Sequence, residues 1–385
     1  MKHRSERCAG FVQSQIRAMT RACNAVGGVN LGQGICDVPT PEIVKQAAQR
    51  AIAEQRSTYT RFDGAAELRR ALATKLERDN GVSVDPESEV VVTVGASGAL
   101  ACTLHALFDP GDELLLFEPF YGYHRNEALA SGLRPVSVPL SPPDFRISIS
   151  ALEAALTPRT RALVVNTPVN PSGKVMTREE LDLLASFCIE HDLVCVTDEV
   201  YEYMVYDGRE HISMASLPGM RERTVTIGSY SKTFSITGWR IGYAAAPAEL
   251  AAGIGLVNDL FYICAPHPLQ HAVAVGIDEL PPAYYEAMCA DYEAKRDRFC
   301  DALDRCGLPA IRPQGAYYVL ADVRRLGCRT AEEAAMALLD QAGVASVAGS
   351  AFFDGAPQGE QLVRFCYAKR DAHLDEAIRR LDAWA

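Results

Sequence analysis

The feature that most constrains the fold is an alternation of short, continuously apolar runs with longer helical patterns, which begins near residue 89. The run 89–95 contains five β-branched residues in succession and is followed by a helical pattern over 99–108. Further apolar runs lie at 113–117, 161–165, 193–197, 224–227 and 239–243, and an amphipathic helical pattern lies at 178–190. Strands without a polar face must be covered on both sides. The pattern therefore predicts an α/β fold with a mostly parallel sheet and helices on both faces.

The pattern of apolar and charged residues changes near residue 285. A charge-rich helical pattern over 284–305 is expected to bridge two domains. Beyond it, apolar runs and helical patterns alternate over shorter lengths, at 317–320, 331–341, 362–367 and 374–384. A chain of 385 residues is long enough for two domains. We predict a large cofactor-binding domain over 44–285 and a smaller α+β domain formed by 1–43 together with 286–385.

Composition excludes several classes of function. The formal net charge is −11 and no basic block stands out, which argues against nucleic-acid binding. No apolar run approaches the ~20 residues that a membrane-spanning helix needs, and none follows the charged segment Met1–Arg7, so we expect no membrane association and a cytoplasmic location. The twelve cysteines occur singly, without a C-x-x-C pair, and the histidines lack metal-ligand spacing. Free thiols and the absence of a metal site are the expectation.

Four short motifs lie near the ends of expected strands, where open α/β sheets bind their ligands. They are residues 166–173, 198–201, 228–232 and 238–242. Each alone has an ordinary explanation: a turn, a solvated acid, a surface lysine or a structural ion pair. Their order and spacing together favour a single site.

The motifs at 228–232 and 238–242 together suit a phosphorylated aldehyde cofactor. The amine of Lys232 can form a Schiff base with such an aldehyde. Ser229 and Ser231 offer hydroxyl groups beside it, and the guanidinium of Arg240 can bind phosphate oxygens in a bidentate manner.

The motifs at 166–173 and 198–201 suit a pyridine ring used as an electron sink. A buried carboxylate such as Asp198 can keep the ring nitrogen protonated. The side chains of Asn170 and Tyr201 can donate hydrogen bonds to a phenolic oxygen on the ring.

These motifs resemble those of the pyridoxal-phosphate-dependent aminotransferases of fold type I, class I/II. The segment 229–242 is similar to the family's lysine signature, and the resemblance runs essentially from end to end. Within the family, the sequence most resembles the kynurenine and glutamine (aromatic) aminotransferases, above all over residues 200–220. Prokaryotic aspartate aminotransferases are also near.

The resemblance implies a role for each matching residue. Lys232 would bind the cofactor covalently and carry a proton, and Asp198 would pair with the pyridine nitrogen. The other implied cofactor contacts are Ala96, Ser97, Tyr121, Asn170, Tyr201, Ser229 and Arg240, together with Tyr59, which would reach the phosphate of the neighbouring subunit. A homodimer with shared active sites follows. For the substrate, the family pattern implies Arg364 as the clamp for the α-carboxylate, with Gly34 and Asn170 beside it. It also implies cis peptide bonds at 118–119 and 170–171.

Some positions depart from the family pattern near the substrate. Ile35, Cys36 and Asp37 stand where an apolar residue and Pro-Asp are usual, and Ala348 stands where relatives often have proline. Ser97 stands where some aspartate aminotransferases have a lysine for a distal carboxylate. No second arginine or lysine stands at a recognisable site for a distal carboxylate, so we expect a largely apolar pocket, lined by Ile16, Ile35, Tyr121, Tyr123, Phe261, Tyr262 and Phe352.

The sequence therefore predicts ping-pong transamination between a neutral or aromatic amino acid and a 2-oxo acid. Burying an unpaired distal carboxylate costs several kcal/mol, whereas an apolar side chain gains roughly 1.5–3 kcal/mol. A carbon–sulfur β-lyase and an aspartate aminotransferase stay open as alternatives on the same scaffold.

Overall fold

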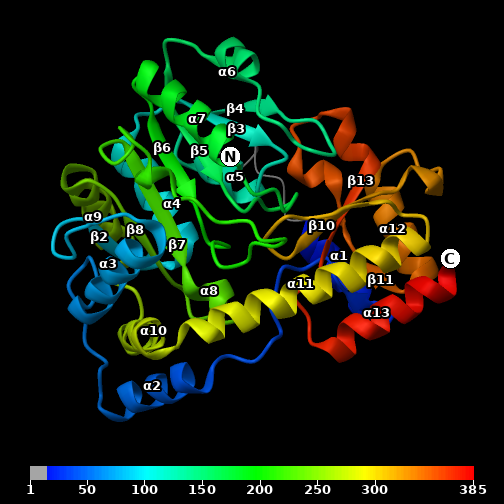
Figure 1. Ribbon diagram of the computed structural model, residues 1–385, viewed down its shortest axis with the longest axis horizontal. Coiled ribbons are helices and arrows are strands. Elements are labelled where there is room, and N and C mark those ends of the chain that lie inside the picture. Colours follow the sequence, from blue (N-terminus) through cyan, green and yellow to red (C-terminus); the bar gives the residue numbers. More distant parts are fainter. Residues whose placement is uncertain (1–14) are drawn as a thin grey trace, which may run out of the picture.

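A seven-stranded sheet forms the centre of the computed structural model, which describes residues 15–385 (Figure 1). Its strands, in spatial order, are β2 (Val90–Val94), β8 (Ile241–Ala245), β7 (Thr224–Ser229), β6 (Val194–Asp198), β5 (Thr160–Asn166), β3 (Glu113–Glu118) and β4 (Arg134–Pro139). Pairing is parallel from β7 to β4, and β8 runs antiparallel to both of its neighbours. The predicted mostly parallel sheet is confirmed, with β8 as the reversed strand.

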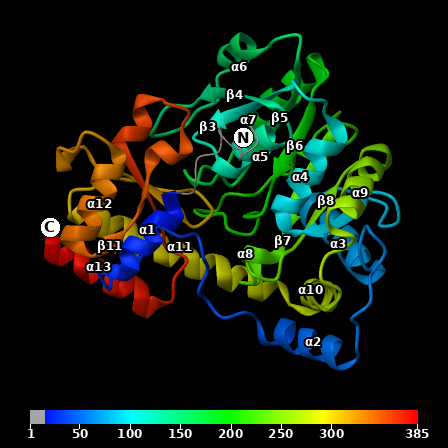
Figure 2. The ribbon, with the colours of Figure 1, turned by 180° about the vertical axis from the view of Figure 1, so that it is seen from behind.

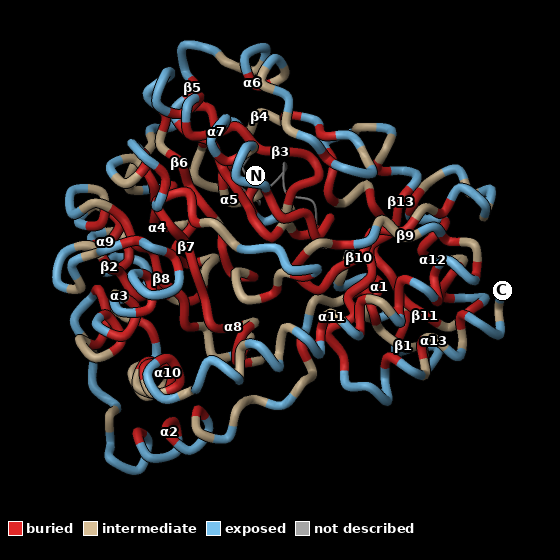
Figure 3. The backbone as a smooth tube through the Cα atoms, in the orientation of Figure 1, coloured by how far each residue is buried: buried red, intermediate tan, exposed pale blue. Residues whose placement is uncertain are grey.

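Helices cover both faces of this sheet. The helices of this part of the chain are α2 (Glu42–Ala53), α3 (Ala66–Asn80), α4 (Gly95–Leu107), α5 (Gly122–Ala130), α6 (Ile149–Ala155), α7 (Arg178–Glu190), α8 (Tyr230–Thr233), α9 (Ala248–Tyr262) and α10 (His267–Glu279), with a 3₁₀ turn at Met214–Ser216. Leu163 of β5 packs into one apolar cluster with α7, whereas the next residue, Val164, packs into another with α4, α5 and α9. This change of face at each residue explains why the strands are apolar throughout. Figure 3 shows their backbone as buried along most of its length.

A second, mainly antiparallel layer lies beside the central sheet (Figure 2). Its strands are β12 (Val347–Ala348), β13 (Leu362–Cys366), β10 (Tyr318–Asp322) and β9 (Ala310–Ile311), with the parallel pair β1 (Val29–Asn30) and β11 (Val344–Ala345). Its helices are α1 (Gln15–Ala25), α11 (Pro282–Arg305), α12 (Ala331–Ala342) and α13 (Asp371–Trp384), with 3₁₀ turns at Arg324–Leu326, Gly349–Phe352 and Pro357–Gln361. Met19 and Leu31 share its apolar core. The division at residues 44 and 286 stays a prediction.

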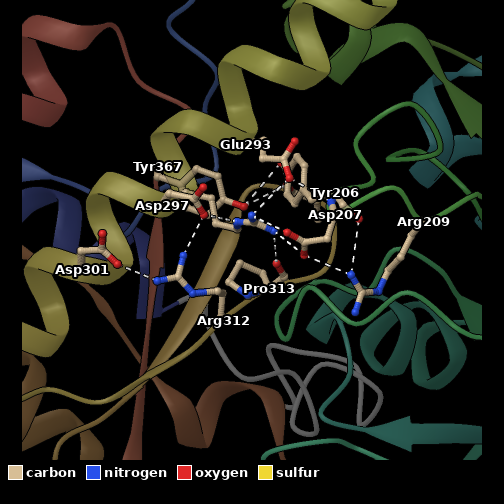
Figure 4. Close-up of polar contacts among 11 residues, drawn as sticks. Tyr206, Asp207, Arg209, Glu293, Asp297, Asp301, Arg312, Pro313 and Tyr367 are labelled. Carbon is tan, nitrogen blue, oxygen red and sulfur yellow. Dashed lines mark hydrogen bonds and ion pairs between the residues drawn. The ribbon is translucent and has the colours of Figure 1, made fainter.

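A buried arginine on α11 ties the two layers together. Arg296 Nη1 and Nη2 each donate a 2.8 Å hydrogen bond to one carboxylate oxygen of Asp207, in a loop that follows β6. Nη1 also donates to the carbonyl oxygen of Pro313 over 3.2 Å, and the guanidinium lies over the ring of Tyr206 (Figure 4). This bidentate contact lowers the pKa of Asp207 below its ordinary value. The long helix α11 is thereby fixed against the loop that carries Tyr201, one of the residues predicted to contact the cofactor.

Three other expectations concern the chain as a whole. No helix within residues 15–385 combines the length and the apolar composition that crossing a bilayer requires. All cysteines of the described part are free thiols, as expected; Cys8 lies outside it, as does the charged segment Met1–Arg7. The two expected cis bonds, at Glu118–Pro119 and Asn170–Pro171, are present, together with two further cis prolines at Pro143 and Pro168.

Candidate active site

A cavity of about 370 Å³ opens at the carboxyl ends of the central strands. Asn166, Asp198 and Ser229, which end β5, β6 and β7, all line it. Eleven of the twelve residues predicted for the site share this lining: Gly34, Ala96, Ser97, Tyr121, Asn170, Asp198, Tyr201, Ser229, Lys232, Arg240 and Arg364. Tyr59 is the exception, because it is 76% exposed and does not line the cavity of its own chain.

Lys232 lies on the short helix α8, directly after β7. Ser229 caps this helix, since its hydroxyl accepts a 3.1 Å hydrogen bond from the backbone N–H of Ser231. The Lys232 ammonium lies 6.0 Å from the ring centre of Tyr201 and 5.7 Å from that of Tyr317. Within residues 15–385 it has no hydrogen bond or ion pair, and its burial lowers its pKa below the ordinary lysine value. The site thus holds an amine poised to lose its proton.

Asp198 has an imidazole partner that the sequence reasoning missed. Nε2 of His124 lies 2.9 Å from Asp198 Oδ2, and the histidine is 3% exposed. Tyr121 packs edge-on against the same imidazole, with ring centres 5.4 Å apart. The three-residue spacing from Tyr121 to His124 is the signal that could have revealed it, because a helix that starts at Gly122 turns both toward one side.

The N-terminus of α4 and the guanidinium of Arg240 meet at one end of the cavity. Gly95 has a φ of +71°, and a β-carbon there would lie 2.4 Å from Arg240 Nη2. Glycine therefore allows the arginine to cross the helix terminus. The backbone amides of Ala96 and Ser97 stand at that terminus, with Ser229 close by along β7. A helix N-terminus, an arginine and a hydroxyl group form a suitable environment for a phosphate.

Arg364 is buried in the lining of the same cavity. It is 1% exposed, and its guanidinium lies between the rings of Tyr318 and Phe352, 4.3 and 4.7 Å from their centres. Nη1 donates to Asn170 Oδ1 over 2.9 Å and Nη2 to the carbonyl oxygen of Gly32 over 2.8 Å, whereas Nε is buried and has no partner among residues 15–385. No carboxylate of the described residues pairs with it. A buried cation with an unsatisfied donor is suited to binding an anionic ligand.

Gly34 provides space for a tyrosine as well as for a ligand. A β-carbon at this position would lie 2.0 Å from the hydroxyl oxygen of Tyr318. That hydroxyl also accepts a 3.3 Å hydrogen bond from Tyr201. The absence of a side chain at Gly34 is thus needed by the aromatic group that covers Arg364.

The residues that line the cavity differ from those expected for the substrate pocket. Phe261 and Tyr262, at the end of α9, do not line the cavity and are exposed, and Phe352 covers Arg364 instead. A cation that no sequence motif marks, Arg17 of α1, also lines the cavity. Arg17 is exposed and has no hydrogen bond or ion pair within the described residues. No motif surrounds it in the sequence; the packing of α1 against β11 and β12 brings it there.

One group of possible metal ligands lies near the site. Atoms of Glu199, Glu202 and His211 lie within 4.8 Å of one another. Each carboxylate is already partnered: Glu202 by Lys75 and Asn80, and Glu199 by His211 and Ser213. We assign no metal to this group.

Comparison with known proteins identifies the family. Residues 26–381 match the profile of aminotransferase class I and II. The chain is 42% identical to the probable N-succinyldiaminopimelate aminotransferase DapC of Mycobacterium tuberculosis, over 95% of each chain. The chain belongs to the class I and II aminotransferases.

Two further comparisons agree with this assignment. The chain is 38% identical to kynurenine–oxoglutarate transaminase 3 of Mus musculus, over 92% of this chain and 84% of that protein. The solved structure of N-succinyldiaminopimelate aminotransferase from M. tuberculosis superposes with a TM-score of 0.96 at 41% identity, covering 99% of this chain and all of the other. The aminotransferase fold and the transamination activity predicted from the sequence are confirmed at this level.

Proposed function

We propose that this aminotransferase uses pyridoxal phosphate, bound covalently at Lys232. The observation that carries the proposal is that a buried lysine, a carboxylate and a helix N-terminus suited to a phosphate all line one cavity. When bound, the cofactor supplies an aldehyde for attachment and an electron sink for charge at the substrate α-carbon.

The residues of the cavity fit this group. Arg240, Ser229 and the amides of Ala96 and Ser97 would hold the phosphate, and Asp198 would pair with the ring nitrogen. Asn170 and Tyr201 would hold the ring hydroxyl, and Tyr121 would stack on the ring. Two buried atoms that lack a partner in the described part of the chain, Arg364 Nε and Glu127 Oε2, belong to residues that line the same cavity, as expected of a site built for polar ligands.

Each side chain then has a task that its surroundings support. Lys232 would attack as the neutral amine, which its burial favours, and would carry the proton at the substrate α-carbon. Arg364 would bind the α-carboxylate through its unpartnered Nε and the neighbouring Nη2, while the hydrogen bond from Nη1 to Asn170 keeps the guanidinium in place. His124 would orient Asp198.

The proposed donor is a neutral or aromatic amino acid, such as phenylalanine, methionine or glutamine. Ile16, Ile35, Tyr121 and Tyr123 give the mouth of the cavity an apolar and aromatic lining. Arg17 favours a second candidate, a donor whose long side chain ends in a carboxylate. The similarity to a protein described as an N-succinyldiaminopimelate aminotransferase supports that candidate too.

A homodimer with shared active sites belongs to the same proposal. Several large apolar side chains are exposed on α9 and the segment before α3: Tyr59 (76%), Phe62 (37%), Leu256 (69%), Leu260 (79%), Phe261 (44%) and Ile263 (47%). Phe62 packs on α9, since a β-carbon at Gly255 would lie 2.6 Å from its ring. Exposed large apolar side chains of this number are typical of an interface. A cytoplasmic location stays a prediction.

Product analysis with a panel of donors tests the proposal. Phenylalanine, methionine, glutamine, aspartate and N-succinyldiaminopimelate are each supplied with pyruvate, 2-oxoglutarate or phenylpyruvate. We expect a new amino acid and a 2-oxo acid, with a higher kcat/KM for the neutral donors than for aspartate. Release of ammonia and pyruvate from a cysteine conjugate as the dominant reaction would instead support the carbon–sulfur β-lyase.

The role of Arg17 is tested by Arg17→Gln, with Arg21→Gln on the same helix as the matched control. An exposed ion pair contributes about 0.2–1 kcal/mol, so kcat/KM for an acid-tailed donor should fall by a factor of about 1.4 to 5. The same variant should leave phenylalanine unaffected. Equal effects of both variants on all donors would exclude Arg17 from substrate recognition.

A further inference from the structure

Glu127 is a carboxylate that the proposed chemistry leaves without a task. It lies on α5, three residues after His124, and both side chains line the cavity that contains Asp198 and Lys232. Residues three apart on a helix face the same side. Glu127 therefore stands beside the pair formed by His124 and Asp198.

The carboxyl group of Glu127 is incompletely satisfied. Its Oε2 atom is buried and has no hydrogen-bond partner in the described part of the chain. An ionised carboxylate in such a place loses its hydration without compensation, whereas the protonated acid retains a donor that a ligand can accept. The orphaned oxygen thus points to a ligand with acceptor groups.

The charged groups around Glu127 come from several elements. Asp198 faces it from the end of β6 and Arg240 from the segment before β8, while Cys102 of α4 and Tyr262 of α9 are close enough for their own pKa values to be raised by it. His124 lies on its own helix. Burial and then Asp198 raise the pKa of Glu127 to about 8, and Arg240 opposes them. Near neutral pH the neutral acid is therefore the prevailing form.

We propose that Glu127 is a residue of the cofactor site which presents a protonated carboxyl group to the anionic cofactor. This inference rests on the proposed pyridoxal-phosphate function. The cofactor brings a phosphate into a cavity that already holds the Asp198 carboxylate. A neutral acid adds a hydrogen-bond donor there, whereas an ionised Glu127 would add another negative charge.

Ionisation of Glu127 should then oppose cofactor binding. Well below pH 8 the free protein already carries the proton, and pH has little effect through this group. Above pH 8 the proton must be taken up when the cofactor binds. By linkage, the dissociation constant rises about tenfold for each further pH unit as long as the bound form stays protonated.

The test measures cofactor affinity rather than turnover. Dissociation constants of pyridoxal phosphate and of 4′-deoxypyridoxine phosphate, which lacks the aldehyde, are determined by fluorescence between pH 6.5 and 9.5. The full chain is compared with Glu127→Gln, which keeps a donor but does not ionise, and with Glu127→Met. Glu190→Gln, at the exposed end of α7, is the matched control.

The expected result is a ratio of wild-type to Glu127→Gln dissociation constants that is flat below pH 7.5 and about tenfold higher at pH 9. The dissociation constants of Glu127→Met, like those of Glu127→Gln, should lack this rise at high pH. Those of Glu190→Gln should rise as in the wild type. A ratio that does not change with pH, in an enzyme that binds the cofactor and transaminates, overturns the role of Glu127 alone. Failure of the wild type to bind either compound overturns the proposed function with it.

Discussion

Arg364 and Asn170 are joined by a 2.9 Å hydrogen bond from Nη1 to Oδ1, although they lie 194 positions apart in the chain. Arg364 belongs to β13 of the antiparallel layer, whereas Asn170 lies in the turn that follows β5 of the central sheet. The bond thus links the two layers across the cavity. Because it uses one guanidinium nitrogen, it also fixes which edge of Arg364 faces a ligand.

Replacing Arg364 with lysine should weaken substrate binding strongly. Lysine keeps the positive charge but loses the planar fork that binds a carboxylate through two nitrogens. A hydrogen bond to a charged group contributes about 1.5–3 kcal/mol, so KM for the amino donor should rise about 10- to 100-fold. The dissociation constant of 3-phenylpropionate, an unreactive carboxylate, gives an independent measurement. Arg370→Lys, whose side chain is exposed, should bind as the wild type does.

Adding a methyl group at Gly34 should disturb the site through Tyr318. The new β-carbon would overlap the tyrosine hydroxyl at 2.0 Å, so that ring must move and uncover Arg364. We expect Gly34→Ala to raise KM and lower the melting temperature, since overpacking costs about 1–3 kcal/mol. The double variant Gly34→Ala/Tyr318→Phe removes the overlapping oxygen and should recover part of both losses. Equal values for the single and double variants would show that Tyr318 does not transmit the effect.

The cofactor residues could be predicted because they occupy short motifs at strand ends. The ends of parallel strands meet at one sheet edge, so Asn170, Asp198, Ser229 and Lys232 had to come together once the strands were recognised. The reversal of β8 was not predictable in the same way, because an apolar run does not encode its direction.

Residues outside the motifs depend on how a helix is turned, and there the sequence was less informative. Arg17 and Glu127 reach the cavity because α1 and α5 present those faces to it, and no local pattern marks them. Phe261 was expected in the pocket but is exposed at the end of α9, where it packs edge-on against His105. The aromatic character of these residues therefore predicted the lining of the substrate pocket only in part.

Removing the Lys232 amine should abolish covalent attachment of the cofactor. We expect Lys232→Ala to lose the mass increase that borohydride treatment produces in the wild-type chain, and to turn over at least about 10²–10⁴-fold more slowly, because the proton carrier is gone. Lys45→Ala, an exposed position on α2, serves as the control. Retention of the mass increase by the variant would place the attachment on another lysine.

Neutralising Asp198 should slow proton removal without destroying cofactor binding. Asparagine keeps the size of the side chain and its contact with His124 but not the charge that stabilises a protonated ring nitrogen. Loss of one preorganised electrostatic contact typically costs about 10²–10³-fold in rate. Single-turnover absorbance with Asp198→Asn would measure the proton-removal step, and borohydride should still attach the cofactor to Lys232. A rate equal to that of the wild type would remove Asp198 from the mechanism.

Mixing inactive variants should restore activity if the sites are shared between subunits. Tyr59 is exposed and does not line the cavity of its own chain, and the proposal assigns its hydroxyl to the partner's phosphate. In a mixture of Lys232→Ala with Tyr59→Ala, each hybrid dimer would contain one site with both residues intact. Random exchange in a symmetric dimer should thus return about one quarter of the wild-type activity. A mixture of Lys232→Ala with Asp198→Ala is the matched control and should stay inactive, since both residues line the same cavity of one chain. With subunit exchange verified by native mass spectrometry, the absence of recovery in the first mixture would contradict shared sites.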